Sequence, residues 1–207
     1  MSGAGPARYL LLNYMKVDAA NVDTVAATVR LPRPTDARFS RAVYRHEAGD
    51  RLMEFVALPD LSGLEELLTH SAWREVEDAV RPRLALDHRR QIHALCDVAK
   101  PSASAVPDAA HVQLIRAEVP PHALAEYRAW RRDVLLPALS ALPGVTACAA
   151  YQSVVSTEPG ALLVTQSRTS PAQLTEAQQA TAPKEALRHA ASHFTLGAVH
   201  TSHWERL

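Results

Sequence analysis

The sequence predicts an α+β protein of two similar halves, each with the element order β-α-β-β-α-β. Three observations predict this class. Alternating and helical apolar patterns occur in that order twice along the 207 residues. A segment rich in Pro, Ser and Ala separates the two copies. Residues 49–80 also align with residues 160–191 at a nearly constant offset, which places Leu64 over Leu174. The predicted organisation is a first half at 8–99, a linker at 100–110 and a second half at 111–207.

The first half opens with a strand and a short amphipathic helix. Asp18 is suited to cap that helix, and Pro32 ends it. The turn at residues 47–50 lies between two runs of β-forming residues, which is typical of a hairpin. After Pro59 the apolar period becomes helical, and it continues to Pro82, so one long helix is predicted. The expected elements are strand 9–17, a helix through Val22, Val25, Ala26 and Val29, strands 39–46 and 51–58, helix 61–81 and strand 88–98.

The second half follows the same order. Pro137 is expected to kink its first helix, and Leu142-Pro143-Gly144 closes it. Pro183 is expected to interrupt its second helix. The expected elements are strand 111–119, helix 120–142, strands 145–155 and 161–168 around a turn at 158–160, helix 171–192 and strand 194–204.

This order is that of a ferredoxin-like split β-α-β unit. A single unit leaves one apolar face of its sheet uncovered, and two units in one chain can cover each other. The sequence therefore predicts two ferredoxin-like repeats that form an intramolecular α+β barrel with antiparallel sheets.

Composition excludes several classes of function. The apolar and charged fractions, 47% and 21%, are those of an ordinary globular protein, and 22 basic residues balance 22 acidic ones. The sequence has no stripe of basic residues that would predict nucleic-acid binding, and no apolar run in it is long enough for a membrane span. The N-terminus predicts no signal peptide, and two cysteines make no disulfide framework. We therefore expect a cytoplasmic protein without nucleic-acid or membrane partners.

Three passages resemble a known family. They are the hairpin AVYRHEAGDRLMEFVAL, the helical segment LLTHSAWREVEDAVRPRL, and the run EYRAWRRDVLLPALSALPGVTACAAYQS. Together they resemble the dimeric α+β barrel superfamily, especially its antibiotic-biosynthesis-monooxygenase branch, in a tandem form. The resemblance implies a hydrophobic, often aromatic, substrate bound between a sheet and its helices. Known activities in that superfamily include cofactor-independent oxygenases and cyclases of aromatic polyketides and haem-degrading monooxygenases.

The resemblance implies a cofactor-independent oxygenase acting on a polycyclic aromatic or polyketide intermediate in antibiotic biosynthesis. Such an enzyme needs a base, a donor for the developing oxyanion, an apolar pocket and dioxygen, and it needs no cofactor. Three alternatives stay open: a non-oxidative cyclase or isomerase, a binding protein without turnover and, less favoured, a haem- or metal-dependent oxygenase. A homodimer is a further expectation for the assembly.

The residues predicted to carry the chemistry lie on the strands of the first half. His46 or Glu54 is the candidate base, with Tyr44 as a catalytic partner, although the related oxygenases have an Asn where Glu54 stands. Asn13 and Arg90 are candidate substrate-binding residues. The ordinary structural interpretation of Glu54 is an ion pair with an arginine such as Arg41 or Arg90, or exposure to solvent. Thr165 takes the place of Glu54 in the second half, so the pocket is expected in the first.

Aromatic residues at core-like spacing are Trp73, Tyr127, Trp130 and Trp204. Core packing is their ordinary interpretation, but they would line a pocket for a planar substrate if one exists, and Trp73 and Trp130 are named as substrate-binding candidates. The haem-degrading members need a Trp and a His on the helix after the hairpin, and Leu67 and Glu77 stand at those places. His189 and His193 lie one helical turn apart, but two ligands do not make a metal site, and none is predicted.

Overall fold

The computed structural model of the chain describes residues 5–86, 88–155, 160–179 and 181–207. Its centre is a closed barrel in which all neighbouring strands are antiparallel. The strands are β1 (Tyr9–Lys16), β2 (Arg41–His46), β3 (Arg51–Leu58), β4 (Arg89–Lys100), β5 (His111–Ala117), β6 (Val145–Val155), β7 (Ala161–Ser167) and β8 (His200–Arg206).

The barrel order is β1-β3-β2-β8-β5-β7-β6-β4. Each half contributes four neighbouring strands, β4-β1-β3-β2 and β8-β5-β7-β6, in the same relative order. The halves join where β2 pairs with β8 and where β4 pairs with β6. Each sheet thus covers the apolar face of the other, and the predicted α+β barrel of two ferredoxin-like halves is confirmed.

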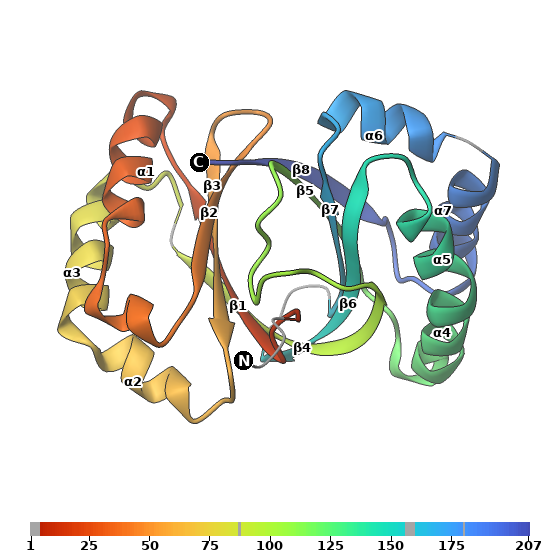
Figure 1. Cartoon of the computed structure of the whole chain (residues 1–207), viewed down its shortest axis with the longest axis horizontal. Helices are drawn as coiled ribbons and strands as arrows, with labels where there is room; N and C mark the ends of the chain where they lie inside the picture. Colours follow the sequence, from red (N-terminus) through yellow and green to blue (C-terminus); the bar gives the residue numbers. More distant parts are fainter. Residues whose placement is uncertain (1–4, 87, 156–159, 180) are drawn as a thin grey trace.

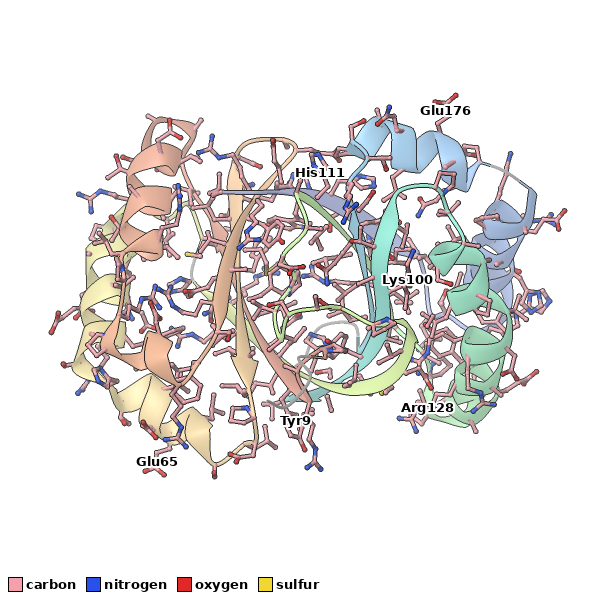
Figure 2. The ribbon with its side chains drawn as sticks, viewed as in Figure 1. Tyr9, Glu65, Lys100, His111, Arg128 and Glu176 are labelled. Carbon is pink, nitrogen blue, oxygen red and sulfur yellow. The ribbon has the colours of Figure 1, made fainter. Side chains whose placement is uncertain are left out.

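The helices lie outside the barrel, in two groups on opposite sides (Figure 1). One group covers the strands of the first half, and the other covers those of the second. The helices of the first group are α1 (Val22–Arg30), α2 (Gly63–Thr69) and α3 (Ser71–Val80); those of the second are α4 (Leu124–Trp130), α5 (Leu136–Ser140), α6 (Pro171–Gln178) and α7 (Thr181–His193). Glu65, Arg128 and Glu176 point outward from them (Figure 2).

The prediction of one long helix at residues 61–81 is wrong. The chain leaves the helical conformation at His70, where φ is −62° and ψ is 131°. His70 Nδ1 accepts a hydrogen bond from the Ala72 backbone N–H at 3.2 Å, so it caps a new helix, α3. A polar capping residue therefore interrupts an apolar pattern that continues through it.

The predicted kink before Pro137 is a π-helical turn at Arg131–Leu135, between α4 and α5. Helix α7 begins at Thr181, two residues before Pro183, so that proline lies in its first turn. There its missing N–H removes no helical hydrogen bond.

Residues 101–110 lie across one end of the barrel. The Ala7 N–H donates to Ala105 O at 3.0 Å, just before β1 begins. Val106 is buried in the cluster of side chains that fills the barrel, and the Tyr44 hydroxyl donates to Ala109 O at 2.9 Å. A cavity of only about 10 Å³ remains between this segment and the barrel strands, and a groove of about 450 Å³ opens beside residues 101–103 and 108–110.

Strand alternation divides the side chains between two environments. On β1, Leu10, Leu12 and Tyr14 face the barrel interior, while Leu11 and Met15 face the helices. On each strand, whether a residue number is odd or even therefore determines whether the side chain lies in the barrel interior or on the helix-covered face. None of the helices in the described ranges is long and apolar enough to cross a membrane.

Candidate functional site

The predicted site residues fall on two opposite faces of the first sheet. Tyr44 and His46 belong to the interior alternation of β2, with Tyr44 in the interior cluster and His46 against the inward Trp204. Asn13, Glu54 and Arg90 belong to the opposite alternation, under α1 and α3. A sheet therefore separates His46 from Glu54, and the two side chains cannot act on one substrate from one pocket.

The open end of the barrel holds a cavity of about 610 Å³, within the roughly 300–1,000 Å³ range of small-molecule sites. We call it the barrel mouth. Six strands contribute to it, mostly through their interior positions, because the ends of these strands meet at this rim. It is lined by Tyr14, His46, Glu47, Arg51, Arg89, Gln91, Arg116, His200, Thr201, Ser202 and Trp204.

Three rings form one wall of the barrel mouth. The Trp204 ring lies 4.9 Å from the His46 ring and 6.3 Å from the Tyr14 ring, both edge-on. Trp204 Nε1 donates to Ser202 Oγ at 2.9 Å, which fixes the indole. Trp204 is only 1% exposed, so it supports this wall from behind, while the half-buried Tyr14 ring and the His46 ring line the cavity in front of it. Of the predicted aromatic candidates, Trp204 is therefore the one that lies beside the large cavity.

His46 is held in one tautomer. Its Nδ1 accepts a hydrogen bond from the Ala48 backbone N–H at 3.0 Å, so the neutral ring carries its proton on Nε2. Burial, followed by the charge of Arg51, lowers the pKa of His46, so the ring is neutral at pH 7. In this state His46 offers a hydrogen-bond donor from Nε2.

Tyr44 lies deeper in the barrel than the cavity lining. Its hydroxyl is bound to Ala109 O, and its ring stands edge-on to Phe55 at 5.5 Å. Burial raises the pKa of Tyr44. The structure therefore gives Tyr44 a packing position beneath the mouth.

His93 lies on the interior face of β4, two residues beyond Gln91, and its side chain is fully buried. Its Nε2 lies 3.3 Å from Gln91 Oε1, while Nδ1 has no hydrogen-bond partner. Burial, followed by the charge of Arg116, lowers the pKa of His93 from its ordinary 6.5 to about 4.

The lowered pKa of His93 predicts acid sensitivity. As pH falls from 6.5 to 4, the unfolded chain binds a proton that the folded chain does not, so folded stability is lost over that window. A shift of this size corresponds to roughly 3 kcal/mol. We expect His93→Gln to remove most of this loss, measured as the free energy of unfolding in urea at pH 7 and pH 4.5. Exposed His122→Gln is the control, and an equal loss in wild type and His93→Gln would contradict the assignment.

Glu54 lies in a buried ionic cluster on the helix-covered face. Its Oε1 is 2.7 Å from Arg41 Nη1 and 3.2 Å from Arg33 Nη1, and its Oε2 accepts from Asn13 Nδ2 at 2.9 Å. Arg33 also donates to Val29 O at 3.0 Å. Burial lowers the pKa of Arg33, and the charge of Glu54 opposes that effect. The expected structural alternative, a pair between Glu54 and Arg41, is confirmed.

Arg90 and Trp73 complete this cluster. Arg90 forms an ion pair with Glu77 and donates from Nε to Asn13 Oδ1 at 3.3 Å. Trp73 Nε1 donates to Glu77 Oε1 at 2.8 Å, and the Arg33 guanidinium lies 4.5 Å from the Trp73 ring centre. The structure thus brings four predicted site residues together, namely Asn13, Glu54, Trp73 and Arg90. Their polar groups, however, bind one another and the neighbouring side chains.

The space around this cluster is about 10 Å³, roughly the volume that holds one water. The haem-degrading relatives named by the resemblance would place haem between this sheet and its helices. Leu67 is fully buried in the core there, and Glu77 binds Trp73 and Arg90. The residues present therefore do not fit a haem between β1, β3 and α3.

The second half has a polar cluster of glutamines and a histidine at the equivalent place. Gln113 and Gln178 donate to each other's carbonyl oxygen, and Gln113 Nε2 lies 2.8 Å from His203 Nε2. A groove of about 490 Å³ opens beside Gln178 and His203. Thr165 is fully buried, with Cys148 Sγ at 3.8 Å. The more open helix-covered space is thus in the second half.

Trp130 lies apart from the other candidates, on α4. Its ring centre is 5.2 Å from that of Phe194 and 5.4 Å from that of His189, on the outer side of the second sheet. The His189 and His193 rings stack at 4.0 Å. No group of three or more His, Cys, Asp or Glu side chains suited to a metal ion occurs within the described ranges.

The sequence interpretation did not name Tyr14, Arg51, Arg89 or Arg116. A signal for Tyr14, Arg51 and Arg116 was present, because each continues the interior alternation of an apolar strand, whereas Arg89 shares its alternation with the polar residues Gln91 and His93. Tyr14 follows Leu10 and Leu12 at a spacing of two. Only the barrel closure shows that these ends meet.

No protein-family model matches the chain, and no curated protein matches it by sequence. Similar solved structures exist. A proposed monooxygenase of Fusobacterium nucleatum has a TM-score of 0.71 at 9% identity, over 100% of this chain and 94% of the other. The chain shares its fold. An anthrone oxidase-like protein gives 0.69 at 12% identity, over 96% and 91%. A ferredoxin-fold protein of Listeria monocytogenes, related to antibiotic biosynthesis monooxygenases, gives 0.54 at 6% identity, over 97% and 95%.

The expected resemblance is thereby supported at the level of the fold. Structures with this fold also include a proposed chlorite dismutase and a haem-degrading enzyme. A shared fold at such low identity does not choose among these activities, which depend on the residues of the site.

Proposed function

We propose that the protein is an enzyme that oxygenates a hydroxyaromatic substrate in the barrel mouth without a cofactor. The observation that carries the proposal is the cavity of about 610 Å³ with its wall of Tyr14, His46 and Trp204. A planar substrate packs its ring against this wall and leaves its oxygen to the polar lining. The fold shared with proposed monooxygenases and with an anthrone oxidase-like protein supports the proposal.

The reaction balances with dioxygen as the oxidant. For an anthrone it is R₂CH₂ + O₂ → R₂C=O + H₂O. Loss of a C–H proton leaves an electron pair that is delocalised onto the ring oxygen. The carbanion reduces dioxygen, a C–O bond forms, and the peroxide takes up a proton. Loss of the remaining C–H proton and cleavage of the O–O bond release water and leave the second carbonyl.

Different residues of the barrel mouth carry out the steps of this reaction. His46 Nε2–H donates to the substrate oxygen on which charge develops. Glu47, the one carboxylate that lines the cavity in the part of the chain that the structure describes, accepts the substrate proton. Arg51, Arg89 and Arg116 also line the cavity, and a guanidinium beside the substrate oxygen lowers the pKa of a bound hydroxyaromatic. The substrate itself supplies the electrons.

The test compares turnover of an anthrone and of a naphthol with and without dioxygen. We expect quinone formation and oxygen uptake in equal amounts in air, and no turnover without oxygen. Turnover that persists without oxygen would replace oxygenation by a cyclase or isomerase activity. A Soret band in the purified protein would overturn the cofactor-independent mechanism.

A second candidate function is ligand binding without turnover. It is favoured by the engagement of His46 Nδ1 with the Ala48 backbone, which leaves no unprotonated ring nitrogen for a base. Saturable binding of both compounds at the barrel mouth, with neither consumed in air nor without it, would select this function.

A further inference from the structure

A chain of polar side chains connects the helix-covered face of the second half with the rim of the barrel mouth. Gln113 on β5 is fully buried, Gln178 on α6 is 6% exposed, and His203 on β8 is 9% exposed. Glu47 lies in the turn after β2, and it lines both the barrel mouth and the groove beside Gln178 and His203. The two cavities therefore share Glu47 as a lining residue.

The two glutamines leave one hydrogen-bond donor for His203. Gln178 Nε2 donates to Gln113 Oε1 at 2.5 Å, and Gln113 Nε2 donates to Gln178 Oε1 at 2.9 Å. The second N–H of Gln113 faces His203 Nε2, which lies 2.8 Å from the amide nitrogen. Because an amide nitrogen only donates, His203 Nε2 accepts this bond, and the neutral ring carries its proton on Nδ1.

Glu47 faces this second nitrogen of the His203 ring. Its Oε2 lies 3.6 Å from His203 Nδ1, and its backbone N–H donates to His203 O at 3.1 Å. The Glu47 side chain is 53% exposed, so a small rotation closes the longer distance to a hydrogen bond. Contacts of this kind are often long in a free enzyme and shorten when substrate binds. Lys184, the other charged side chain among the described residues of the groove, offers donors only.

We propose that His203 is a positioning residue, which directs its Nδ1–H at Glu47 and holds that carboxylate at the rim of the barrel mouth. The inference rests on the proposed function, in which Glu47 accepts the substrate proton. With Oε2 bound to His203, Oε1 is left for the substrate. His203 does not line the barrel mouth, so its effect on the reaction passes through Glu47. The polar cluster of the second half thus orients a base that the first half supplies.

The ¹⁵N spectrum of the histidine rings, recorded at pH 8 without substrate, tests the contact independently of turnover. We expect the His203 ring to carry a proton on Nδ1, with its signals identified by their absence from His203→Asn. Glu47→Leu is expected to move the Nδ1 signal, because it removes the facing carboxylate. Gln113→Glu replaces the facing donor by an acceptor and is expected to add a proton at Nε2. A wild-type ring protonated on Nε2 alone, or an Nδ1 signal that is unmoved in Glu47→Leu, overturns the inference.

Oxygen uptake with a hydroxyaromatic substrate tests the positioning role. His203→Phe keeps a flat ring but removes the donor, so kcat is expected to fall about tenfold, less than the full contribution of a general base, while KM changes little. His203→Asn also loses the contact with Gln113, but it keeps a donor close to the place of Nδ1 and is expected to recover most of the loss. Each variant is checked for folding by circular dichroism, and exposed His122→Gln is the control.

The outcomes separate this inference from the proposed oxygenation. An unchanged kcat in His203→Phe, or a loss in His203→Asn as large as in His203→Phe, overturns the positioning role even if the wild type oxidises anthrones. A ring protonated on Nδ1 that responds to Glu47→Leu, with no oxygen uptake by the wild type on any hydroxyaromatic, supports the contact and overturns the oxygenation. The wild-type spectrum keeps the inference falsifiable if His203→Phe does not fold.

Discussion

Replacing Glu54 by Gln is expected to lower the free energy of unfolding by about 3–5 kcal/mol, because the change leaves buried arginine charge uncompensated. Glu54 is 3% exposed, and Arg33 is 6% exposed. Glu54 Oε1 is the oxygen that both Arg33 and Arg41 contact. Asp36 also pairs with Arg41, so the larger part of the loss arises at Arg33. Urea unfolding at pH 7 measures the change.

The control for Glu54 is the exposed ion pair between Arg38 and Glu66, in which both side chains are 49% exposed. Glu66→Gln is expected to cost no more than about 1 kcal/mol. The double variant Arg33→Met/Glu54→Gln is expected to regain part of the loss, because it removes the buried charge together with its partner. A cost below 1 kcal/mol for Glu54→Gln would contradict the buried cluster.

Glu54→Gln also separates a structural role from a catalytic one. If Glu54 were the base, the variant would lose turnover even where it is fully folded. We expect turnover per folded molecule to persist at low temperature, because the cluster and the barrel mouth lie on opposite faces of the sheet.

Replacing His46 by Phe is expected to lower kcat for a hydroxyaromatic substrate by about 10²–10³-fold, the loss typical of one oxyanion donor. Phe keeps the aromatic wall beside Trp204, so binding of the ring is retained and KM changes less than kcat. Steady-state oxygen uptake measures both constants.

His46→Gln distinguishes a donor from a base. A Gln amide can donate from Nε2, but it cannot take up a proton at neutral pH. We expect Gln to restore at least tenfold of the activity lost in His46→Phe. If Gln is as inactive as Phe while both variants are folded, His46 acts as the base, and the tautomer set by Ala48 does not describe the reacting enzyme. His122→Gln, exposed and outside the barrel, is the control for changing any histidine.

Sequence patterns alone predict the repeated order of elements, the two hairpins and the helix-covered apolar faces. Short-range signals carry this information: turn residues, apolar periods and prolines act over a few positions. The same kind of signal failed at His70, where a capping side chain ends a helix inside an unbroken apolar pattern.

The direction in which each candidate side chain points depends on how the barrel closes. Along one strand, side chains alternate between the barrel interior and the helix-covered face. The sequence alone does not show whether the odd-numbered or the even-numbered residues face the interior. The closed barrel resolves this by pairing β2 with β8 and β4 with β6. It thereby buries Glu54 among arginines and gathers His46, Trp204 and three arginines around one cavity, because side chains from distant strands meet only when the sheet closes.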